Sequence, residues 1–141
     1  MKMRRISPTG NYFVTVPEGI AEECDGRVVS FWKKGESLLL QLSSYGRSEG
    51  AQVSAEERMT ALLKRQPLSR VSRDATVAID CPDFAVASGV DQQGIVWVYV
   101  YAVWADLAVM ITISGNEGEL LDDKNWAFQA ARSLGRTDSK V

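Results

Sequence analysis

Residues 95–114 read IVWVYVYAVWADLAVMITIS and are rich in β-branched and aromatic residues. Such residues favour strands over helices. The dipeptide Ala105-Asp106 interrupts the run and divides it into two strand-length halves. The stretch therefore predicts an antiparallel hairpin, around which we expect the rest of the sheet to be built.

A tight turn at Ala105-Asp106 fixes the pairing of the two strands, because it places Trp104 opposite Leu107. Side chains alternate between the two faces of a strand. One face then pairs Ala102 with Val109, Val100 with Ile111 and Val98 with Ile113, and the other pairs Tyr101 with Met110, Tyr99 with Thr112 and Trp97 with Ser114. A slip of one residue would mix these sets. We expect the aliphatic face to be core, and the aromatic face to meet a helix, a partner or water.

The remaining pattern predicts one α+β domain over residues 1–141, a mostly antiparallel, twisted sheet of six to seven strands with two helices. We expect further strands at 12–16, 27–33, 36–43, 75–79 and 84–90, and helices at 54–66 and 122–134. Residues 1–10 are expected to be a loose lead-in, 18–25 a short helical turn, 44–53 and 115–121 loops, and 136–141 a frayed tail.

Local signals support several of these boundaries. Ser54 and Glu57 fit a capping box, and Pro67 stops the helix that they open. Lys34-Gly35 predicts a hairpin turn between the second and third strands. Asp122 is a candidate N-cap for the second helix, and Gly135 is a candidate residue just past its C-terminal end.

Composition limits the classes of function. The chain has 141 residues, 45% of them hydrophobic, and a formal charge of −2, which gives no electrostatic footprint for nucleic acid. Residues 1–13 lack the apolar segment of a secretory signal, and no uninterrupted apolar run has the length of a membrane span. We therefore expect a cytoplasmic protein. Its two cysteines, Cys24 and Cys81, are expected to be reduced thiols, although the sequence leaves a disulfide open.

No residue pattern predicts catalysis. Histidine, the commonest general base and metal ligand, is absent. Carboxylates at Glu117, Glu119, Asp122 and Asp123 either bind a cation or sit beside a helix start, and they lack the spacing of a calcium loop. Arg70 and Arg73, after Lys64 and Arg65, form a basic patch that either binds phosphate or is solvated at a helix end. Asp80 and Asp83 flank Cys81-Pro82 and are expected to stabilise the turn. We expect no cofactor and no enzymatic activity.

The order of elements resembles the PsbP-like fold, a three-layer α/β/α sandwich shared by extrinsic photosystem II proteins and DcrB-like bacterial proteins, the latter including chaperones associated with type VI secretion effectors. The matching features are the segment 13–19 (FVTVPEG), a single helix after the third strand, and the long hairpin followed by a helix that carries Trp126. This resemblance implies an adaptor, chaperone or other partner-binding module. Bacterial immunity proteins, which bind a cognate toxin, also resemble small acidic α+β domains of this kind.

We therefore expect a non-enzymatic domain that binds another protein, such as a toxin or effector, with neither nucleic acid nor membrane as partner and with a homodimer possible. The candidate contact residues are Trp97, Tyr99, Tyr101, Met110, Glu117 and Glu119. The alternative is a small-molecule-binding domain whose pocket lies between a helix and the aromatic sheet face. A flat exposed apolar patch would favour the first function, and a deep pocket with convergent polar groups would favour the second.

Overall fold

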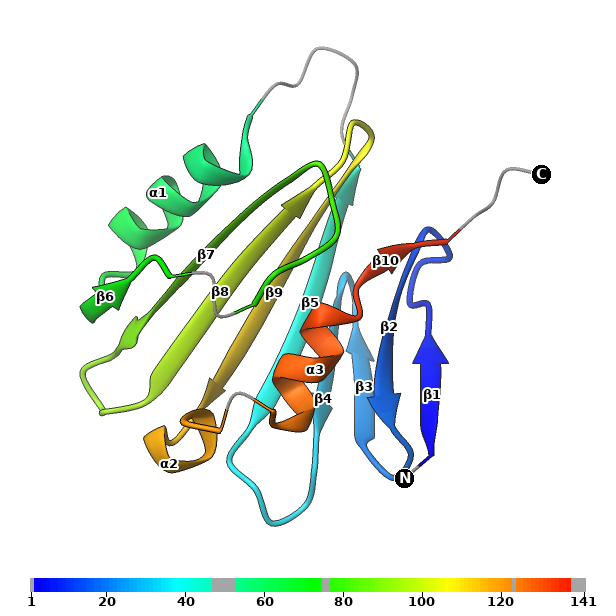
Figure 1. The fold of residues 1–141 in the computed structure, drawn as a ribbon, viewed down its shortest axis with the longest axis horizontal. Coiled ribbons are helices and arrows are strands. Elements are labelled where there is room, and N and C mark those ends of the chain that lie inside the picture. The colour runs from blue at the N-terminus through cyan, green and yellow to red at the C-terminus, as the bar shows by residue number, and fades with distance from the viewer. Residues whose placement is uncertain (1, 47–52, 75–76, 123, 138–141) are drawn as a thin grey trace.

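The structure, a computed structural model, describes residues 2–46, 53–74, 77–122 and 124–137. These residues form a large sheet in the order β3-β4-β5-β9-β8-β7-β6 and a small sheet in the order β1-β2-β10, both antiparallel (Figure 1). The large sheet consists of β3 (Ala21–Asp25), β4 (Val28–Trp32), β5 (Leu39–Gly46), β6 (Ser69–Ser72), β7 (Asp83–Val90), β8 (Val96–Val103) and β9 (Leu107–Gly115). The small sheet consists of β1 (Met3–Ile6), β2 (Tyr12–Pro17) and β10 (Gly135–Arg136). The helices are α1 (Ala55–Arg65), α2 (Glu117–Leu120) and α3 (Trp126–Arg132).

The predicted register of the central hairpin is confirmed. Strands β8 and β9 pair Val98 with Ile113 and Val100 with Ile111 on one face, and Tyr99 with Thr112 on the other. The amide of Trp104 donates to the Leu107 carbonyl at 2.7 Å and closes the turn. The predicted β4–β5 hairpin is also confirmed, and Gly35 supplies the positive φ of 88° in its turn. Its connection is longer than the two residues expected, because the last pair is Trp32 with Leu39.

Two clusters of buried side chains lie on opposite sides of the large sheet. The back face, which carries Val98, Val100 and Ala102, packs against α3 and β2. The front face, which carries Tyr99 and Tyr101, packs against α1. Helix, sheet and a second helical layer therefore form the expected sandwich. Figure 1 shows α1 at the β7 end of the large sheet and the small sheet at the opposite end.

Helix α1 begins and ends where the sequence predicts. The Ser54 hydroxyl accepts from the Glu57 amide at 3.0 Å, and the Glu57 carboxylate accepts from the Ser54 amide at 3.4 Å. Oδ2 of Asp83 accepts from the Ala55 amide at 2.9 Å. Asp83 thus binds the start of α1 from β7, instead of stabilising only its own turn. Gln66, before Pro67, is the C-cap and accepts a hydrogen bond from the Tyr99 hydroxyl at 3.1 Å.

The N-terminal predictions were wrong in two places. Part of the expected lead-in, Met3–Ile6, is strand β1, which pairs with β2 from Met3↔Pro17 to Ile6↔Val14. The expected helical turn at 18–25 is largely strand β3, because pairing with β4 satisfies its backbone. Its charged side chains suit an edge strand, where they discourage unwanted pairing. Arg4 joins the two segments through an ion pair with Glu22 at 2.9 Å.

Further corrections concern residues 69–80. The strand expected at 75–79 is not formed by the described residues 77–79, and residues 75 and 76 lie outside the described part. The partner of β7 is instead β6, whose residues Ser69 and Ser72 pair with Val90 and Ser88 across a bulge. Val77 and Ile79 are nevertheless buried in the back-face cluster. Of the loop expected at 44–53, residues 44–46 belong to β5 and 47–52 lie outside the described part.

The predicted C-terminal helix at 122–134 is the shorter α3, and the segment 115–121, expected to be a loop, contains α2. Asn116 caps α2 within the expected loop, and Asn125 caps α3 with its Oδ1 accepting from the Phe128 amide at 2.9 Å. Asp122 is therefore not the N-cap. Gly135 does not terminate a helix but lies in β10, paired with Phe13 of β2. Arg136, expected to fray, is held by Asp106, whereas residues 138–141 lie outside the described part.

None of the helices in the described ranges combines the length and the apolar composition required to cross a bilayer.

Candidate functional site

None of the helices among the described residues covers the whole of the front face. Helix α1 packs on β7 and β8, and its side chains Ala55, Met59 and Leu62 fill the space above Tyr99 and Tyr101. The same face continues across β9, β5 and β4. Successive strands place Tyr101, Met110, Ser43 and Val28 directly opposite one another in a single row. The row begins buried at Tyr101, which is 6% exposed, and ends at Val28, which is 37% exposed.

This uncovered area is called the open face below and is defined by Val28, Ser30, Trp32, Leu39, Gln41, Tyr45, Met110 and Thr112. Trp32 is 36% exposed and Tyr45 38% exposed, while Leu39 and Met110 are half-buried. The Gln41 side-chain amide donates to the Ser30 hydroxyl at 3.2 Å. The open face thus combines aromatic and aliphatic side chains with a few hydrogen-bonding groups.

An acidic edge borders the open face. Strand β3 is the neighbour of β4, and its residues Glu23 and Asp25 stand opposite Ser30 and Val28, on the same side of the sheet. Within the described residues, neither carboxylate makes an ion pair, whereas Glu22 on the other side is bound by Arg4. Two unpaired negative charges therefore lie beside the exposed apolar residues.

The candidate contact residues of the hairpin differ in how accessible they are in the structure. Tyr99 and Tyr101, 3% and 6% exposed, are covered by α1, so the expectation that they form an accessible contact surface needs correction. Burial raises the pKa of both phenols. Trp97 is half-buried, and its indole N–H donates to Asp91 Oδ2 at 2.8 Å, which lowers the pKa of that carboxyl. Met110 is the one member of this set that lies on the open face.

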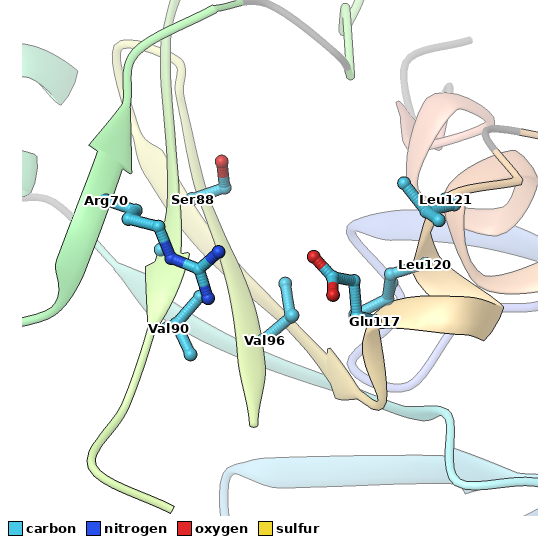
Figure 2. A pocket seen from close by; sticks show the side chains of 8 residues that line it. Arg70, Ser88, Val90, Val96, Glu117, Leu120 and Leu121 are labelled. Atoms are coloured by element: carbon cyan, nitrogen blue, oxygen red, sulfur yellow. The ribbon is translucent and has the colours of Figure 1, made fainter. Parts of the chain in front are cut away.

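A second feature is a groove of about 240 Å³ between the β6–β8 end of the large sheet and α2. It is called the α2 groove below and is lined by Arg70, Ser88, Gly89, Val90, Val96, Glu117, Leu120 and Leu121. Figure 2 shows the guanidinium of Arg70 and the carboxylate of Glu117 reaching toward each other from opposite walls, with Val96 between them and Val90 below the guanidinium. Within the described residues, neither side chain makes a hydrogen bond or an ion pair.

Arg70 has an unusual backbone. Its φ of 52° is the only positive value among the described non-glycine residues. For an L-residue this left-handed conformation costs roughly 1–2 kcal/mol. It accompanies the bulge of β6, which lies very close to β7: a Cβ on Gly89 would stand 2.6 Å from the Leu68 Cβ. The glycine therefore allows the close approach that brings Arg70 to the groove.

The acidic residues after β9 do not converge on one point. Glu117 faces the groove, whereas Oε1 of Glu119 accepts from the Ser37 amide at 2.9 Å and from the Ser37 hydroxyl. Asp122 Oδ1 accepts from the Lys124 amide at 3.0 Å, and Asp123 lies outside the described part. No group of three or more carboxylate or thiol side chains among the described residues is arranged to hold a metal ion. Glu119 thus joins α2 to the β4–β5 turn.

The other candidate chemical groups have structural partners. Arg73 donates to Glu56 at 2.6 Å and to the Val86 carbonyl at 3.1 Å. The Cys81 thiol donates to the Asp83 carbonyl at 3.3 Å, and burial raises its pKa, so it is a poorer nucleophile than an ordinary cysteine. Cys24 is an exposed free thiol on β3. Arg73 and Cys81 therefore have local roles in holding β6 and β7 in place.

Comparisons with known proteins identify the fold. No family model matches the chain, and no curated protein sequence is similar to it. The solution structure of cyanobacterial PsbP (CyanoP) from Synechocystis sp. PCC 6803 is similar with a TM-score of 0.71 and 13% identity, over 96% of this chain and 92% of that one. A crystal structure of a protein from Bacteroides thetaiotaomicron VPI-5482 is similar with a TM-score of 0.69 and 10% identity. That match covers 99% of this chain and 50% of the other, so this chain spans half the length of that protein.

These likenesses show a PsbP-like α+β fold, as expected from the sequence. At such low identity they show the fold alone, and function has to be argued from the open face and the α2 groove.

Proposed function

We propose that this chain is a non-catalytic domain that binds another protein through the open face, in the cytoplasm. The concrete form is a bacterial immunity protein that binds a toxin, or an adaptor or chaperone for a secreted effector. The observation that carries the proposal is the uncovered half of the front face, where Trp32 stands opposite Leu39 at one end, Tyr45 and Val28 are exposed toward the other end, and Met110 lies half-buried between the two ends. Aromatic residues and methionine are enriched at interface cores.

The negative charge beside the open face indicates the charge expected on the partner's surface. Glu23 and Asp25 lie along one margin without ion pairs among the described residues, and they favour a partner surface edged with lysine or arginine. Such rim charges mainly accelerate association and select the orientation, while the exposed aromatic residues, which the partner would bury, supply most of the affinity. The proposed partner is thus a protein with an apolar patch beside a basic margin.

The open face does not resemble a ligand pocket. Met59 and Leu62 fill the space between α1 and the aromatic residues, where the small-molecule alternative places its pocket. A flat surface of this composition suits a protein contact better than it suits a small ligand, which needs a concave site.

The test is affinity capture from the native cell with matched variants. Trp32→Ala and Tyr45→Ala should each weaken the captured interaction at least tenfold, because tryptophan and tyrosine are the residues that most often carry binding energy at protein contacts. Glu23→Gln should slow association and reduce its dependence on salt. Val71→Ala is the control, because Val71 is a similarly exposed residue, 45%, on the far edge strand β6.

Two results would contradict the proposal. One is a partner that binds the Trp32 and Tyr45 variants as tightly as the unmodified chain. The other is a self-association that these substitutions abolish in light-scattering measurements over a dilution series, because the open face would then join two copies of this chain.

A further inference from the structure

We propose that the α2 groove binds a small zwitterion with an apolar body, of the α-amino acid class, independently of the protein contact on the open face. Arg70 takes the carboxylate of the ligand and Glu117 takes its ammonium group. The apolar body lies on Val90, Val96 and Leu121.

The two charges of the groove suit the two ends of such a ligand. The guanidinium and the carboxylate approach the same hollow from opposite walls and do not pair with each other (Figure 2). A guanidinium offers parallel N–H donors that match a carboxylate, and a glutamate oxygen accepts from an ammonium group. Because the two charges of the site cancel, a ligand with both charges is favoured over one with a net charge.

The size and the floor of the groove set the class of ligand. A volume of about 240 Å³ is below the roughly 300–1,000 Å³ of sites for drug-sized molecules. A single amino acid is of suitable size for this volume. The floor and rim are aliphatic, and Leu121 at the rim is 78% exposed, so an apolar side chain on the ligand would cover it.

The backbone of Arg70 supports the same conclusion. Strained residues cluster at binding sites, where the strain positions a side chain. Here the left-handed conformation of Arg70 coincides with a guanidinium that lines the groove, while Arg73 on the same segment is bound to Glu56 and to the Val86 carbonyl. Of these two arginines, Arg70 is the one that remains available for a ligand.

The experiment is a titration of the isotope-labelled chain followed by amide chemical shifts. The probes are L-leucine, L-isoleucine, L-methionine and L-phenylalanine, with leucinamide and N-acetyl-leucine lacking one charge each. We expect at least one free amino acid to shift the amides of Val90, Val96 and Glu117, and both modified leucines to bind at least tenfold more weakly than leucine does.

Substitutions in the groove test which residue binds the carboxylate of the ligand and which binds its ammonium group. Arg70→Gln should remove the preference for leucine over leucinamide, and Glu117→Gln should remove the preference over N-acetyl-leucine. Arg70→Gly should also lose binding while the chain stays folded, since glycine adopts positive φ readily. Lys64→Gln on the exposed side of α1 is the control and should bind like the unmodified chain.

The proposal fails if none of the four amino acids shifts these amides at tens of millimolar concentration. It also fails if the Arg70 and Glu117 variants bind every probe as the unmodified chain does. Substitutions at Trp32 and Tyr45 should leave these titrations unchanged. The protein contact on the open face and the amino-acid site in the α2 groove are therefore tested independently.

Discussion

Val100 and Thr112 are close neighbours in the central hairpin, and they face opposite sides of the sheet. Val100 is fully buried on the back face opposite Ile111, whereas Thr112 is half-buried on the open face. An unpaired carboxylate at Val100 would lose its hydration, at a cost of several kcal/mol. That cost is comparable with the whole stability of a domain of this size, about 5–15 kcal/mol.

We therefore expect Val100→Asp to abolish folding, as measured by circular dichroism and denaturant titration. The control, Thr112→Asp, introduces the same group on the other face and should retain a cooperative transition. If the Val100 variant folds and the Thr112 variant does not, Val100 does not lie on the buried back face and Thr112 does not lie on the open face.

Asp106 and Arg136 predict how stability changes in acid. The Arg136 guanidinium binds both carboxylate oxygens, at 2.8 and 3.1 Å, and these hydrogen bonds hold the pKa of Asp106 below its ordinary value of 3.8. A carboxyl whose pKa is lowered by folding stabilises the fold above its ordinary value and stops doing so as the pH falls through the folded value. We expect Asp106→Asn to be less stable than the unmodified chain at neutral pH.

The difference in unfolding free energy between the two should disappear below the folded pKa of Asp106. Urea titrations from pH 7 to pH 2 provide the measurement. Arg136→Gln should lose the same pH-dependent contribution and, at every pH, also the hydrogen bond from Arg136 Nε to the Asn11 carbonyl at 2.8 Å. Parallel profiles for the variant and the unmodified chain at all pH values would refute this role of the pair.

Helix α1 depends on its capping box. Ser54→Ala removes the acceptor of the Glu57 amide and should lower the free energy of unfolding by about 1 kcal/mol. Lys64→Ala on the solvent side should change it by less than about 0.5 kcal/mol. Denaturant titration measures both changes in the free energy of unfolding. Equal changes for Ser54→Ala and Lys64→Ala would mean that α1 is held only by its packing on β7 and β8.

Strand β6 depends on Gly89. An added Cβ would stand 2.6 Å from the Leu68 Cβ and 2.9 Å from the Ser69 carbonyl oxygen, so Gly89→Ala should displace β6. Overpacking of this kind costs about 1–3 kcal/mol. Gly46→Ala is the matched control, because a Cβ there meets nothing within 4 Å. A Gly89 variant with unchanged stability and unchanged amide shifts in the α2 groove would contradict this account.

The sequence predicts some elements well for a physical reason. In the central hairpin the turn fixes the register, and alternation then assigns every side chain to a face, so the pairing of Val98 with Ile113 follows from local information. Strand β3 has no such pattern: Ala21–Asp25 is mainly acidic, and only its pairing with β4 makes it a strand. Strand β10 has two residues, too few for any periodicity to appear.

The start of the last helix was predicted wrongly for a different reason. The sequence analysis placed its N-cap at Asp122, and Asn125, which caps α3 in the structure, is an equally good residue type for that position. The packing of Phe128 into the back-face cluster accompanies the choice of Asn125. The α2 groove was harder to predict than any of these elements. Arg70 belongs to the basic patch and Glu117 to the acidic cluster, and the two residues line one groove only because β6 lies beside β7.

The geometry of the whole molecule explains why an open face exists. A helix is about 10–12 Å across with its side chains, and strands are spaced by about 4.8 Å, so one helix covers about two strands. Helix α1 lies over β7 and β8, and the front face of β9, β5 and β4 extends beyond it. The back face is better covered because α3 and β2 share it. The amount of uncovered sheet depends on how elements pack, which no local pattern records.

The position of β10 has a consequence for synthesis on the ribosome. Strand β10 pairs with β2 through Gly135 and Phe13, so this contact forms only after residue 135 has been made. At an elongation rate of up to about 20 residues per second, at least roughly six seconds pass between the synthesis of Tyr12, Val14 and Val16 and that of α3 and β10, which cover them. During that interval a nascent-chain chaperone that recognises apolar segments has its best opportunity to bind, and slower translation should lengthen it.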